Sequence, residues 1–399
     1  MSVVSFGCRL NAAEAEAIEA QLGDGVVVVN TCAVTAEAVR QARQAIRRAA
    51  RARPDARIVV TGCAAQIDPA GFAAMPEVSR VLGNVEKLDA ANYAAIGDRV
   101  AVANIMAATG IAAPRSVDRA RHTRAFVEIQ TGCDHRCTFC VIPYGRGNSR
   151  SLPAAAIVEH IARVVESGIK EVVLTGVDIT SFAPEPLGIL VQRILREVPA
   201  LPRLRLSSID SIEVDDALVE AAADPRLMPQ FHLSLQAGDD LILKRMRRRH
   251  NRAQAIAVCD RLRAVRPAIA FGADLITGFP TETEAMFANT LALVDDCGLS
   301  QLHVFPFSPR PGTPAARMPP VAPAVARDRA ARLRTLGATR RAAAMTAQVG
   351  RPQHILVERD GVTGHTETFL PARLAAPAPR GSIADVTATG VSGDRLDCR

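Results

Sequence analysis

Three cysteines close together in the chain constrain its fold more than any other feature. Cys133, Cys137 and Cys140 follow Gly132, with three and then two residues between them. The alternating run 126–130 before them predicts a strand. A loop leaving a strand end can turn three thiolates toward one point, and three thiolates leave one iron of a four-iron cluster free. The spacing therefore favours an iron–sulfur cluster whose open iron binds a substrate or cofactor.

Two other interpretations of this loop remain open. A zinc knuckle needs a fourth Cys or His nearby. His135 is the candidate, but it lies inside the loop and no second pair of ligands accompanies it. The three residues could also be buried thiols without a metal.

The first 97 residues repeat a unit of one strand and one helix. Strands are expected at 3–6, 26–30 and 57–61, and helices at 11–22 and 36–52. Asn11 is expected to cap the first helix, with Glu14 completing a capping box. Alternating strands and helices imply a parallel sheet with crossover connections.

A second set of three cysteines follows these strands. Cys8, Cys32 and Cys63 each come shortly after a predicted strand. The carboxyl ends of parallel strands meet at one sheet edge, where open α/β sheets bind their ligands. The three thiols could therefore share a second cluster, although a single cysteine at a strand end is often only a small apolar residue.

Length, charge and cysteine use narrow the class of protein. A chain of 399 residues is long enough for two or three domains. The net charge of +7 favours a polyanionic partner. Nine cysteines in a chain of this length point to a reducing compartment and metal ligation. We found no signal peptide and no apolar run long enough to span a membrane, so the cytoplasm is expected.

Residues 125–348 continue the alternation of strands and helices. Strands are expected at 125–130, 171–175, 203–208, 231–235, 269–276 and 301–305, and helices near 153–167, 187–197, 215–223, 253–265 and 284–297. Six such units suit an open, partial (βα)6 barrel with its cofactor at the carboxyl ends of the strands. A helix rich in Arg and Ala extends this domain to residue 348.

Two further segments complete the predicted organisation. Residues 98–124 read as a linker, with a basic set at Arg115, Arg119, Arg121 and Arg124. Residues 349–399 carry short apolar runs broken by Gly and Pro, which predict a small β-barrel. Cys259 and Cys297 are expected to be helix-core thiols, and Cys398 a tail residue.

The cysteine motifs resemble those of a known family. CxxxCxxC with Phe139 before the last cysteine resembles the signature of radical S-adenosylmethionine (SAM) enzymes. The wording IQTGCDHRCTFCVIPYGRGNSRS resembles the methylthiotransferases among them. GCRLN, NTCAVTAEA and VTGCAAQ, around Cys8, Cys32 and Cys63, resemble the amino-terminal domain of the same family.

This resemblance implies the cofactors and the chemistry. It implies two 4Fe–4S clusters, one on Cys133, Cys137 and Cys140 and an auxiliary one on Cys8, Cys32 and Cys63. It also implies two SAM molecules per turnover. One donates a methyl group to a sulfur at the auxiliary cluster, and the other is split to a 5′-deoxyadenosyl radical that removes the hydrogen from C2 of adenine. No side chain is expected to act as a general acid or base.

The resemblance also implies SAM contacts at the strand ends. The expected contacts are Gly176, Ser208, Asp210 and Gln236, with Phe139 and Tyr144 as either adenine contacts or packing residues. Many members of the family have Glu at the position of Asp210. A turn glycine is the alternative for Gly176.

The densest basic stretch runs from Lys244 to Arg252 and suits RNA phosphates. Lys244, Arg245, Arg247, Arg248 and Arg249 are the expected RNA contacts, and a solvated helix end is the alternative. The wording LSLQAGDDLILKRMRRRHN resembles the branch of the family that modifies N6-threonylcarbamoyladenosine in tRNA. VERDGVTGHTETFLPARL resembles the TRAM domain, an RNA-binding module of the family.

The sequence thus predicts a methylthiotransferase acting on N6-threonylcarbamoyladenosine beside the tRNA anticodon. Its expected partners are the anticodon arm of tRNA, an electron donor such as a flavodoxin or ferredoxin, and a sulfur source, with no membrane. One rival is the same chemistry on isopentenyl-adenosine in tRNA or on an aspartate of a ribosomal protein. A rival of another class is a non-catalytic iron–sulfur electron-transfer or RNA-binding protein.

Overall fold

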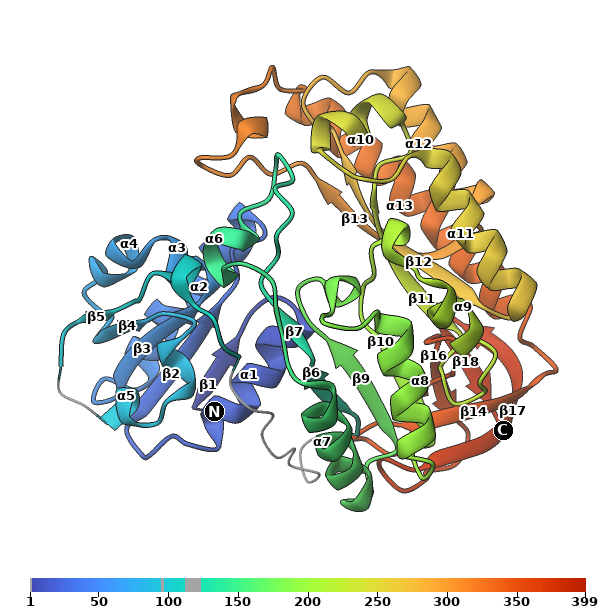
Figure 1. Cartoon of the computed structure of the whole chain (residues 1–399), viewed down its shortest axis with the longest axis horizontal. Coiled ribbons are helices and arrows are strands. Elements are labelled where there is room, and N and C mark those ends of the chain that lie inside the picture. The colour runs from blue at the N-terminus through green and yellow to red at the C-terminus, as the bar shows by residue number, and fades with distance from the viewer. Residues whose placement is uncertain (1, 95–96, 112–122) are drawn as a thin grey trace.

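The chain folds into three domains that pack side by side (Figure 1). This computed structural model describes residues 2–94, 97–111 and 123–399. Arg115, Arg119 and Arg121 of the predicted basic set lie outside the described residues. No helix among the described residues is both long and apolar enough to cross a bilayer.

The amino-terminal domain is a five-stranded parallel sheet with its strands in sequential order. Its strands are β1 (Val3–Ser5), β2 (Val26–Thr31), β3 (Arg57–Gly62), β4 (Arg80–Leu82) and β5 (Val100–Ala101), and its helices are α1 (Arg9–Glu19), α2 (Ala36–Ala52), α3 (Cys63–Ile67), α4 (Pro69–Ala73) and α5 (Ala91–Ala94). Apolar side chains of β2 and β3 are buried on both faces, as in sheets covered by helices on either side. Because β5 pairs with β4, the sheet extends past the predicted domain boundary at residue 97.

The first helix begins earlier than predicted. Cys8 is its N-cap and Asn11 lies inside it, so the expected capping box is wrong. The Asn11 side chain instead donates hydrogen bonds to the carbonyls of Phe6 and Thr31. Asn11 therefore ties the helix to the carboxyl ends of β1 and β2.

The central domain is the predicted partial barrel of six βα units. Its barrel strands are β6 (Ala125–Glu128), β9 (Glu171–Thr175), β10 (Arg203–Leu206), β11 (Gln230–Gln236), β12 (Ala270–Thr277) and β13 (Leu299–Pro306). They form two three-stranded parallel sheets, β10–β9–β6 and β11–β12–β13. Two isolated bridges, Leu204 to Leu227 and Ile209 to Leu233, join the two sheets.

Helices cover the outside of these strands. They are α7 (Ala154–Glu166), α8 (Leu187–Glu197), α9 (Asp216–Ala221), α10 (Asp240–Met246), α11 (Arg252–Val265) and α12 (Glu284–Asp296). Phe231, Leu233 and Leu235 of β11 join the core beneath the helices. Side chains alternate along a strand, so His232 faces the barrel interior.

Short elements complete this domain and its borders. They are β7 (Gln130–Thr131), α6 (Ile142–Arg146), β8 (Arg150–Ser151) and the single 3-10 turns η1 (Glu86–Leu88), η2 (Ile105–Ala107), η3 (Ile179–Ser181), η4 (Ser211–Glu213) and η5 (Pro314–Arg317).

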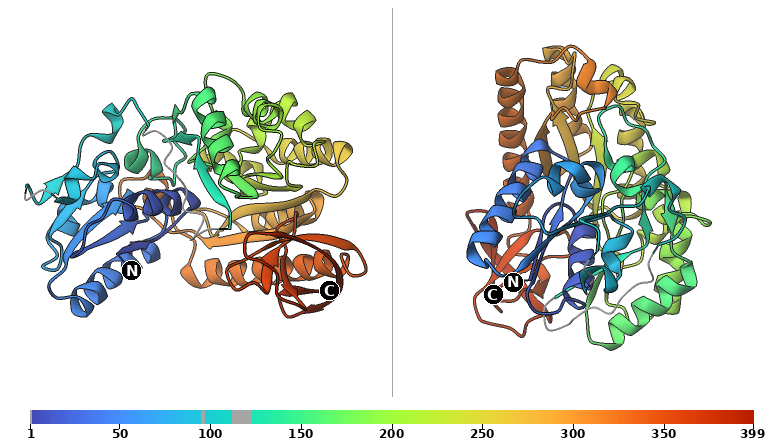
Figure 2. Two further views of the ribbon diagram at one scale, coloured as in Figure 1. Left: turned by 90° about the horizontal axis from the view of Figure 1, so that it is seen from below. Right: turned by 90° about the vertical axis from the view of Figure 1, so that its left-hand side faces the viewer.

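The carboxyl-terminal domain is a closed barrel that packs beside the long helix α13 (Pro323–Thr346), as Figure 2 shows. Its strands are β14 (Pro352–Val357), β15 (Thr363–His365), β16 (Pro371–Leu374), β17 (Ile383–Ser392) and β18 (Arg395–Cys398). The predicted barrel is therefore confirmed. Cys398 is not a free tail residue, because it is buried in the barrel core with Ile355 and Leu396.

The remaining two cysteines form an unexpected pair. Cys259 and Cys297 are buried in the central core, as predicted. Their thiols also contact each other, and a hydrogen bond with Cys297, together with burial, raises the pKa of Cys259.

Candidate functional site: two cysteine groups joined by an arginine

The loop that carries Cys133, Cys137 and Cys140 is closed at its base by a short antiparallel pair. Gln130 and Thr131 of β7 pair with Ser151 and Arg150 of β8. Gly132 follows with a φ of +75°, and a Cβ there would lie 1.9 Å from the Asn148 carbonyl oxygen. Only glycine fits such a close backbone approach. The loop therefore leaves the sheet at a fixed point.

Gln130 connects the base of this loop to the next strand. Its side-chain amide donates to the Gly132 carbonyl at 2.8 Å, and its side-chain oxygen accepts from the Val177 and Asp178 amides at 3.1 and 2.8 Å. A Cβ on Gly176 would lie 2.6 Å from the Gln130 carbonyl oxygen. Gly176 thus permits the turn after β9 to pack against the cysteine loop.

The three thiols of the loop converge. Burial, with a smaller contribution from the nearby Cys137, raises the pKa of Cys140 to about 12. Burial likewise raises the pKa of Cys133, with Asp178, Cys140 and Cys137 adding to the effect. The three thiols therefore lie close enough to influence one another electrostatically. We name Cys133, Cys137 and Cys140 the barrel cysteine group.

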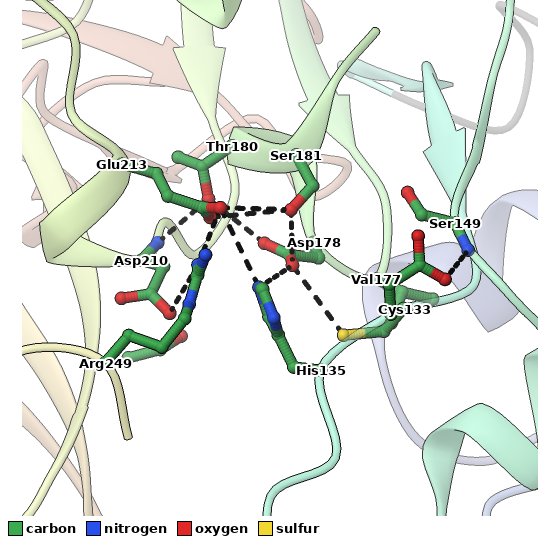
Figure 3. Close-up of polar contacts among 12 residues, drawn as sticks. Cys133, His135, Ser149, Val177, Asp178, Thr180, Ser181, Asp210, Glu213 and Arg249 are labelled. Atoms are coloured by element: carbon green, nitrogen blue, oxygen red, sulfur yellow. Dashed lines mark hydrogen bonds and ion pairs between the residues drawn. The ribbon is translucent and has the colours of Figure 1, made fainter. Parts of the chain in front are cut away.

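Carboxylates and a histidine surround Cys133 (Figure 3). Asp178 Oδ2 lies 3.7 Å from Cys133 Sγ and 2.9 Å from His135 Nε2. The hydroxyl groups of Thr180 and Ser181 donate to Asp178 at 3.0 and 2.8 Å. Hydrogen bonds with Asp178 and Glu213 raise the pKa of His135 to about 9. His135 therefore interacts mainly with carboxylates, although its ring nitrogen, the Cys133 sulfur and an Asp178 oxygen lie within 4.8 Å of one another.

Arg248 approaches the barrel cysteine group from the other side. Its guanidinium donates to Asp210 Oδ2 at 2.9 Å and to the Ser234 carbonyl at 2.7 Å, and lies 3.8 Å from Cys137 Sγ. Only 8% of its side chain is exposed. Arg248 was predicted to contact RNA, and in the structure Asp210 draws its side chain inward, away from solvent.

The other predicted RNA contacts differ in exposure. Lys244, Arg247 and Arg249 are exposed, and Arg249 pairs with Glu213 at 2.6 Å. Arg245 is half-buried and donates to the Thr281 hydroxyl at 2.8 Å. Three of the five predicted residues therefore present their side chains to solvent.

The predicted SAM contacts lie at the carboxyl ends of the barrel strands. Gly176 follows β9, Ser208 and Asp210 follow β10, and Gln236 ends β11 with a φ of +68°. Burial would raise the pKa of Asp210, but His250 and Arg248 hold it at about 2. The structure thus gathers these four residues at the end of the barrel where the cysteine loop lies.

The two predicted aromatic contacts have different surroundings. Phe139 packs edge-to-face on Phe279, with ring centroids 6.3 Å apart. Phe279 packs in turn on Phe307. Tyr144 is 56% exposed on α6. Phe139 is therefore in contact with an aromatic neighbour, whereas the Tyr144 ring is exposed.

Cys8, Cys32 and Cys63 meet at the carboxyl edge of the amino-terminal sheet, as predicted. We name them the sheet cysteine group. Burial, with smaller contributions from Cys63 and Cys8, raises the pKa of Cys32 to about 11. Gly7 has a φ of +99°, and a Cβ there would lie 2.8 Å from the Cys32 sulfur. Glycine is therefore needed for β1 to deliver Cys8 beside Cys32.

Arg146 joins the two groups. It ends α6, which follows directly from the cysteine loop, and its Nε donates to Cys63 Sγ at 3.1 Å. Its guanidinium also pairs with both oxygens of Glu14 and with Asn11. Cys140 and Cys63 are close enough for Cys63 to raise the pKa of Cys140. The helix α6 therefore begins directly after the barrel cysteine group and ends at a residue that contacts the sheet cysteine group.

A buried ion network supports Arg146. Lys87 Nζ lies 2.6 Å from Glu14 Oε2, and both side chains are almost fully buried. Burial would raise the pKa of Glu14, but Arg146 and Lys87 hold it at about 2. Sequence reasoning missed Arg146, Glu14 and Lys87, because only the folded chain brings these distant positions together. A capping-box pattern was the only local signal around Glu14.

The donor sets suit iron–sulfur clusters. Each group offers three thiols, and no other cysteine joins either group, because Cys259 and Cys297 lie in the central core and Cys398 in the small barrel. A guanidinium faces a sulfur in each group, Arg146 at Cys63 and Arg248 at Cys137. Such cations favour thiolate ligands and the negative charge of a cluster.

Comparison with known proteins agrees with this arrangement. Residues 127–294 match the Radical SAM superfamily, and residues 1–83 match the Uncharacterized protein family UPF0004. The chain is 45% identical over 406 residues to the threonylcarbamoyladenosine tRNA methylthiotransferase MtaB of Rickettsia prowazekii, covering 99% of this chain and 96% of that protein. It is 36% identical over 341 residues to the MtaB protein of Thermotoga maritima, covering 79% and 76%.

A solved structure shares the fold. The radical S-adenosylmethionine methyltransferase TsrM of Kitasatospora setae superposes with a TM-score of 0.58 at 17% identity, covering 74% of this chain and 67% of TsrM. This likeness concerns the fold alone.

Proposed function

The chain belongs to the MtaB family of threonylcarbamoyladenosine tRNA methylthiotransferases, and from this premise we propose that it methylthiolates C2 of N6-threonylcarbamoyladenosine beside the tRNA anticodon. The radical SAM family predicted from the cysteine motifs is confirmed, and a 4Fe–4S cluster and SAM come with it. The observation that carries the proposal is 45% identity to MtaB over nearly the full length of both chains, combined with two groups of three cysteines.

The barrel cysteine group is proposed to hold the 4Fe–4S cluster that binds SAM. When bound, this cluster supplies the electron that cleaves SAM, which is radical chemistry that no side chain can perform. Asp178 and His135 fix the position of Cys133 through the contacts described above. Arg248 does the same for Cys137 and keeps Asp210 ionised.

Residues at the strand ends are proposed to bind SAM. Gly176, Ser208, Asp210 and Gln236 are the proposed contacts, and Tyr144 is the proposed aromatic one. Phe139 is proposed to support the loop through its packing on Phe279. In this arrangement the barrel positions SAM, and general acid–base catalysis is not required, because a carbon-bound hydrogen at C2 is removed as an atom.

The sheet cysteine group is proposed to hold a second, auxiliary cluster. Support comes from the convergence of Cys8, Cys32 and Cys63 and from the hydrogen bond that Arg146 donates to Cys63. An open iron there would hold the sulfur that becomes the methylthio group. The single helix between the two groups agrees with a substrate carbon that must meet both.

RNA is proposed to approach over two positive surfaces. Lys244, Arg247 and Arg249 form the first, beside the end of the barrel that carries the cysteine loop. The second is a cavity of about 760 Å³ between β13, α13 and the carboxyl-terminal barrel, where Arg334 and Arg341 contribute positive charge and Arg395 pairs with Asp394. Phosphate contacts of this kind add affinity that falls as salt rises.

The reaction also needs an electron donor and a source of sulfur. We propose a flavodoxin or ferredoxin for the first and an external sulfur donor for the second. Both requirements follow from the balance of the reaction, since the substrate supplies neither an electron nor a sulfur atom.

Metal analysis of protein purified without oxygen tests the cluster assignment. Two four-iron clusters correspond to about eight irons per chain, and replacing either cysteine group with alanine should leave about four. Intact protein that never holds more than four irons would contradict the second cluster.

Nucleoside analysis of tRNA from a deletion strain tests the substrate. We expect the 2-methylthio form of threonylcarbamoyladenosine to disappear. If that form persists and methylthiolated isopentenyl-adenosine is lost instead, the same chemistry acts on the other nucleoside. A protein that produces no 5′-deoxyadenosine with SAM and dithionite would be a non-catalytic iron–sulfur protein.

A further inference from the structure

Arg9 immediately follows Cys8, and its side chain points toward the interior of the central barrel. Its guanidinium carbon lies 5.7 Å from the centre of the Phe369 ring. Phe369 belongs to the turn between β15 and β16 of the carboxyl-terminal barrel and has a φ of +64°. Arg9 therefore reaches from its position beside Cys8 to an aromatic ring of the carboxyl-terminal domain.

The Phe369 ring lies at the inner face of the central barrel. Arg205 lies over the same ring at 4.8 Å and Arg124 at 5.3 Å. Arg205 is fully buried on β10, between Leu204 and Leu206, which face the helices. Because side chains alternate along a strand, Arg205 and the ring beneath it face the barrel interior.

Three of the four arginines in this region have carboxylate partners. Glu171 lies 3.2 Å from both Arg124 and Arg205, and 3.8 Å from Arg203. Glu358 lies 2.7 Å from Arg124. Within the described part of the chain, Arg9 makes neither an ion pair nor a side-chain hydrogen bond.

The other charged groups near Arg9 leave its charge uncompensated. Asp274 is the next carboxylate, and it is bound by His232 at 3.0 Å and by His303 at 3.2 Å. Burial, followed by Arg205 and Arg124, lowers the pKa of Arg9, whereas the smaller effects of Glu171 and Asp274 act in the opposite direction. A guanidinium in such a setting gains most from a bound anion, because burying a charge without a partner is costly.

The proposed substrate contains a suitable anion. A carbonyl group joins adenine N6 to the amino group of threonine, so the threonine keeps a free carboxylate, whereas an isopentenyl group carries no charge. Resting on the proposed function, we propose that Arg9 binds the threonyl carboxylate of the substrate and makes the enzyme specific for N6-threonylcarbamoyladenosine. Its place next to Cys8 holds that carboxylate near the auxiliary cluster, and the planar fork of Arg suits two parallel hydrogen bonds to a carboxylate.

A binding experiment with matched RNAs tests this proposal. Two anticodon stem-loops of one sequence are compared, one carrying threonylcarbamoyladenosine and one in which its carboxylate is a primary amide. Binding is measured by fluorescence anisotropy on cluster-loaded protein with SAM but without reductant, so that no turnover occurs. We expect the wild type to prefer the carboxylate RNA by about 10- to 100-fold, the range of a charge-assisted hydrogen-bonded pair.

Substitutions assign the preference to Arg9. In Arg9→Gln the preference should fall close to one, whereas Arg9→Lys should keep part of it. The control Arg48→Gln removes an exposed arginine of α2 and should leave the preference unchanged. The melting temperature of each variant separates a loss of folding from a loss of recognition.

Three results would overturn the proposal. Equal binding of the two RNAs by the wild type means that the carboxylate is not recognised. Equal weakening of both RNAs in Arg9→Gln assigns Arg9 to the phosphate backbone. An unchanged preference in Arg9→Gln assigns Arg9 to packing on Phe369. Failure of the proposed function is a separate outcome, in which cluster-loaded wild type under reducing conditions forms no methylthiolated product from the carboxylate RNA.

Discussion

The Nε of Arg146 lies 3.1 Å from the Sγ of Cys63, although the two residues are 83 positions apart and belong to different domains. Arg146 ends the helix that follows the barrel cysteine group, and Cys63 begins the helix that follows β3. Val141, which caps the helix that ends at Arg146, packs in the amino-terminal core. The two cysteine groups are therefore held by one structural unit.

Replacing Arg146 with Gln should selectively weaken cluster binding at the sheet cysteine group. The substitution removes the cation facing Cys63 and leaves Glu14 with Lys87 alone. We expect 10- to 100-fold weaker retention of iron, on the order of the effect of residues that orient metal ligands. Iron is measured during chelator challenge in a background lacking the barrel cysteine group, so that only the auxiliary centre is counted.

The matched control for this variant is Arg40→Gln, which removes an exposed arginine that pairs only with neighbours on its own helix. It should leave iron retention unchanged. Full retention in Arg146→Gln would mean that the hydrogen bond to Cys63 does not support the cluster.

Replacing Glu14 with Gln should destabilise the amino-terminal domain. The carboxylate is buried between Arg146 and Lys87, and removing its charge leaves two buried cations facing each other. Removing one partner from a buried ion pair costs about 3–5 kcal/mol. Urea unfolding measures the free energy difference, with Asp24→Asn at an exposed position as the control. A loss below about 1 kcal/mol, the range of surface ion pairs, would contradict this account.

Local patterns in the sequence predicted most of the architecture. The strand 171–175 and the helices 36–52 and 187–197 were predicted to the residue. The strand is a short apolar run buried along its whole length, and the apolar residues of the two helices repeat with the helical period, so neighbouring residues alone define all three. The meeting of the sheet cysteine group was predictable because the carboxyl ends of parallel strands share one sheet edge, and that of the barrel cysteine group because its three residues are close together on one loop.

Features that depend on distant partners could not be predicted in this way. Asn11 reads as a helix cap, but its side chain bonds the Thr31 carbonyl twenty residues later. Arg248 looks like its exposed neighbours until Asp210, thirty-eight residues earlier, draws it inward. Nothing local distinguishes Arg9 from any other arginine, because its surroundings come from three domains.

Replacing Asp178 with Asn should impair the barrel cysteine group. Asp178 contacts Cys133 and accepts hydrogen bonds from His135, Thr180 and Ser181. The Asn side chain replaces one of the two acceptor oxygens with an NH2 group, so some of these hydrogen bonds would be lost. We expect 5′-deoxyadenosine formation with SAM and dithionite to fall by about 10- to 100-fold. Asp216→Asn, at an exposed position of α9, is the control. An unchanged rate of 5′-deoxyadenosine formation in Asp178→Asn would contradict a role for Asp178 in supporting the barrel cysteine group.

Acid should weaken the attachment of the carboxyl-terminal barrel through Glu358. Burial would raise the pKa of this carboxyl, but His365, Arg124 and Thr123 hold it at about 2. Since the folded pKa lies below the ordinary value, the carboxylate stabilises the fold at neutral pH. That stabilisation is lost as the pH falls from about 4.5 toward 2.

Glu358→Gln should therefore lower stability at pH 7 and make it less sensitive to acid. Limited proteolysis between α13 and β14 at pH 7, 5 and 3.5 measures the release of the barrel. Wild type should become more susceptible as the pH falls, whereas Glu358→Gln should be susceptible already at pH 7 and change less. Asp394→Asn, an exposed carboxylate of the same barrel, should follow the wild type. Parallel pH profiles for wild type and Glu358→Gln would assign the acid response to other groups.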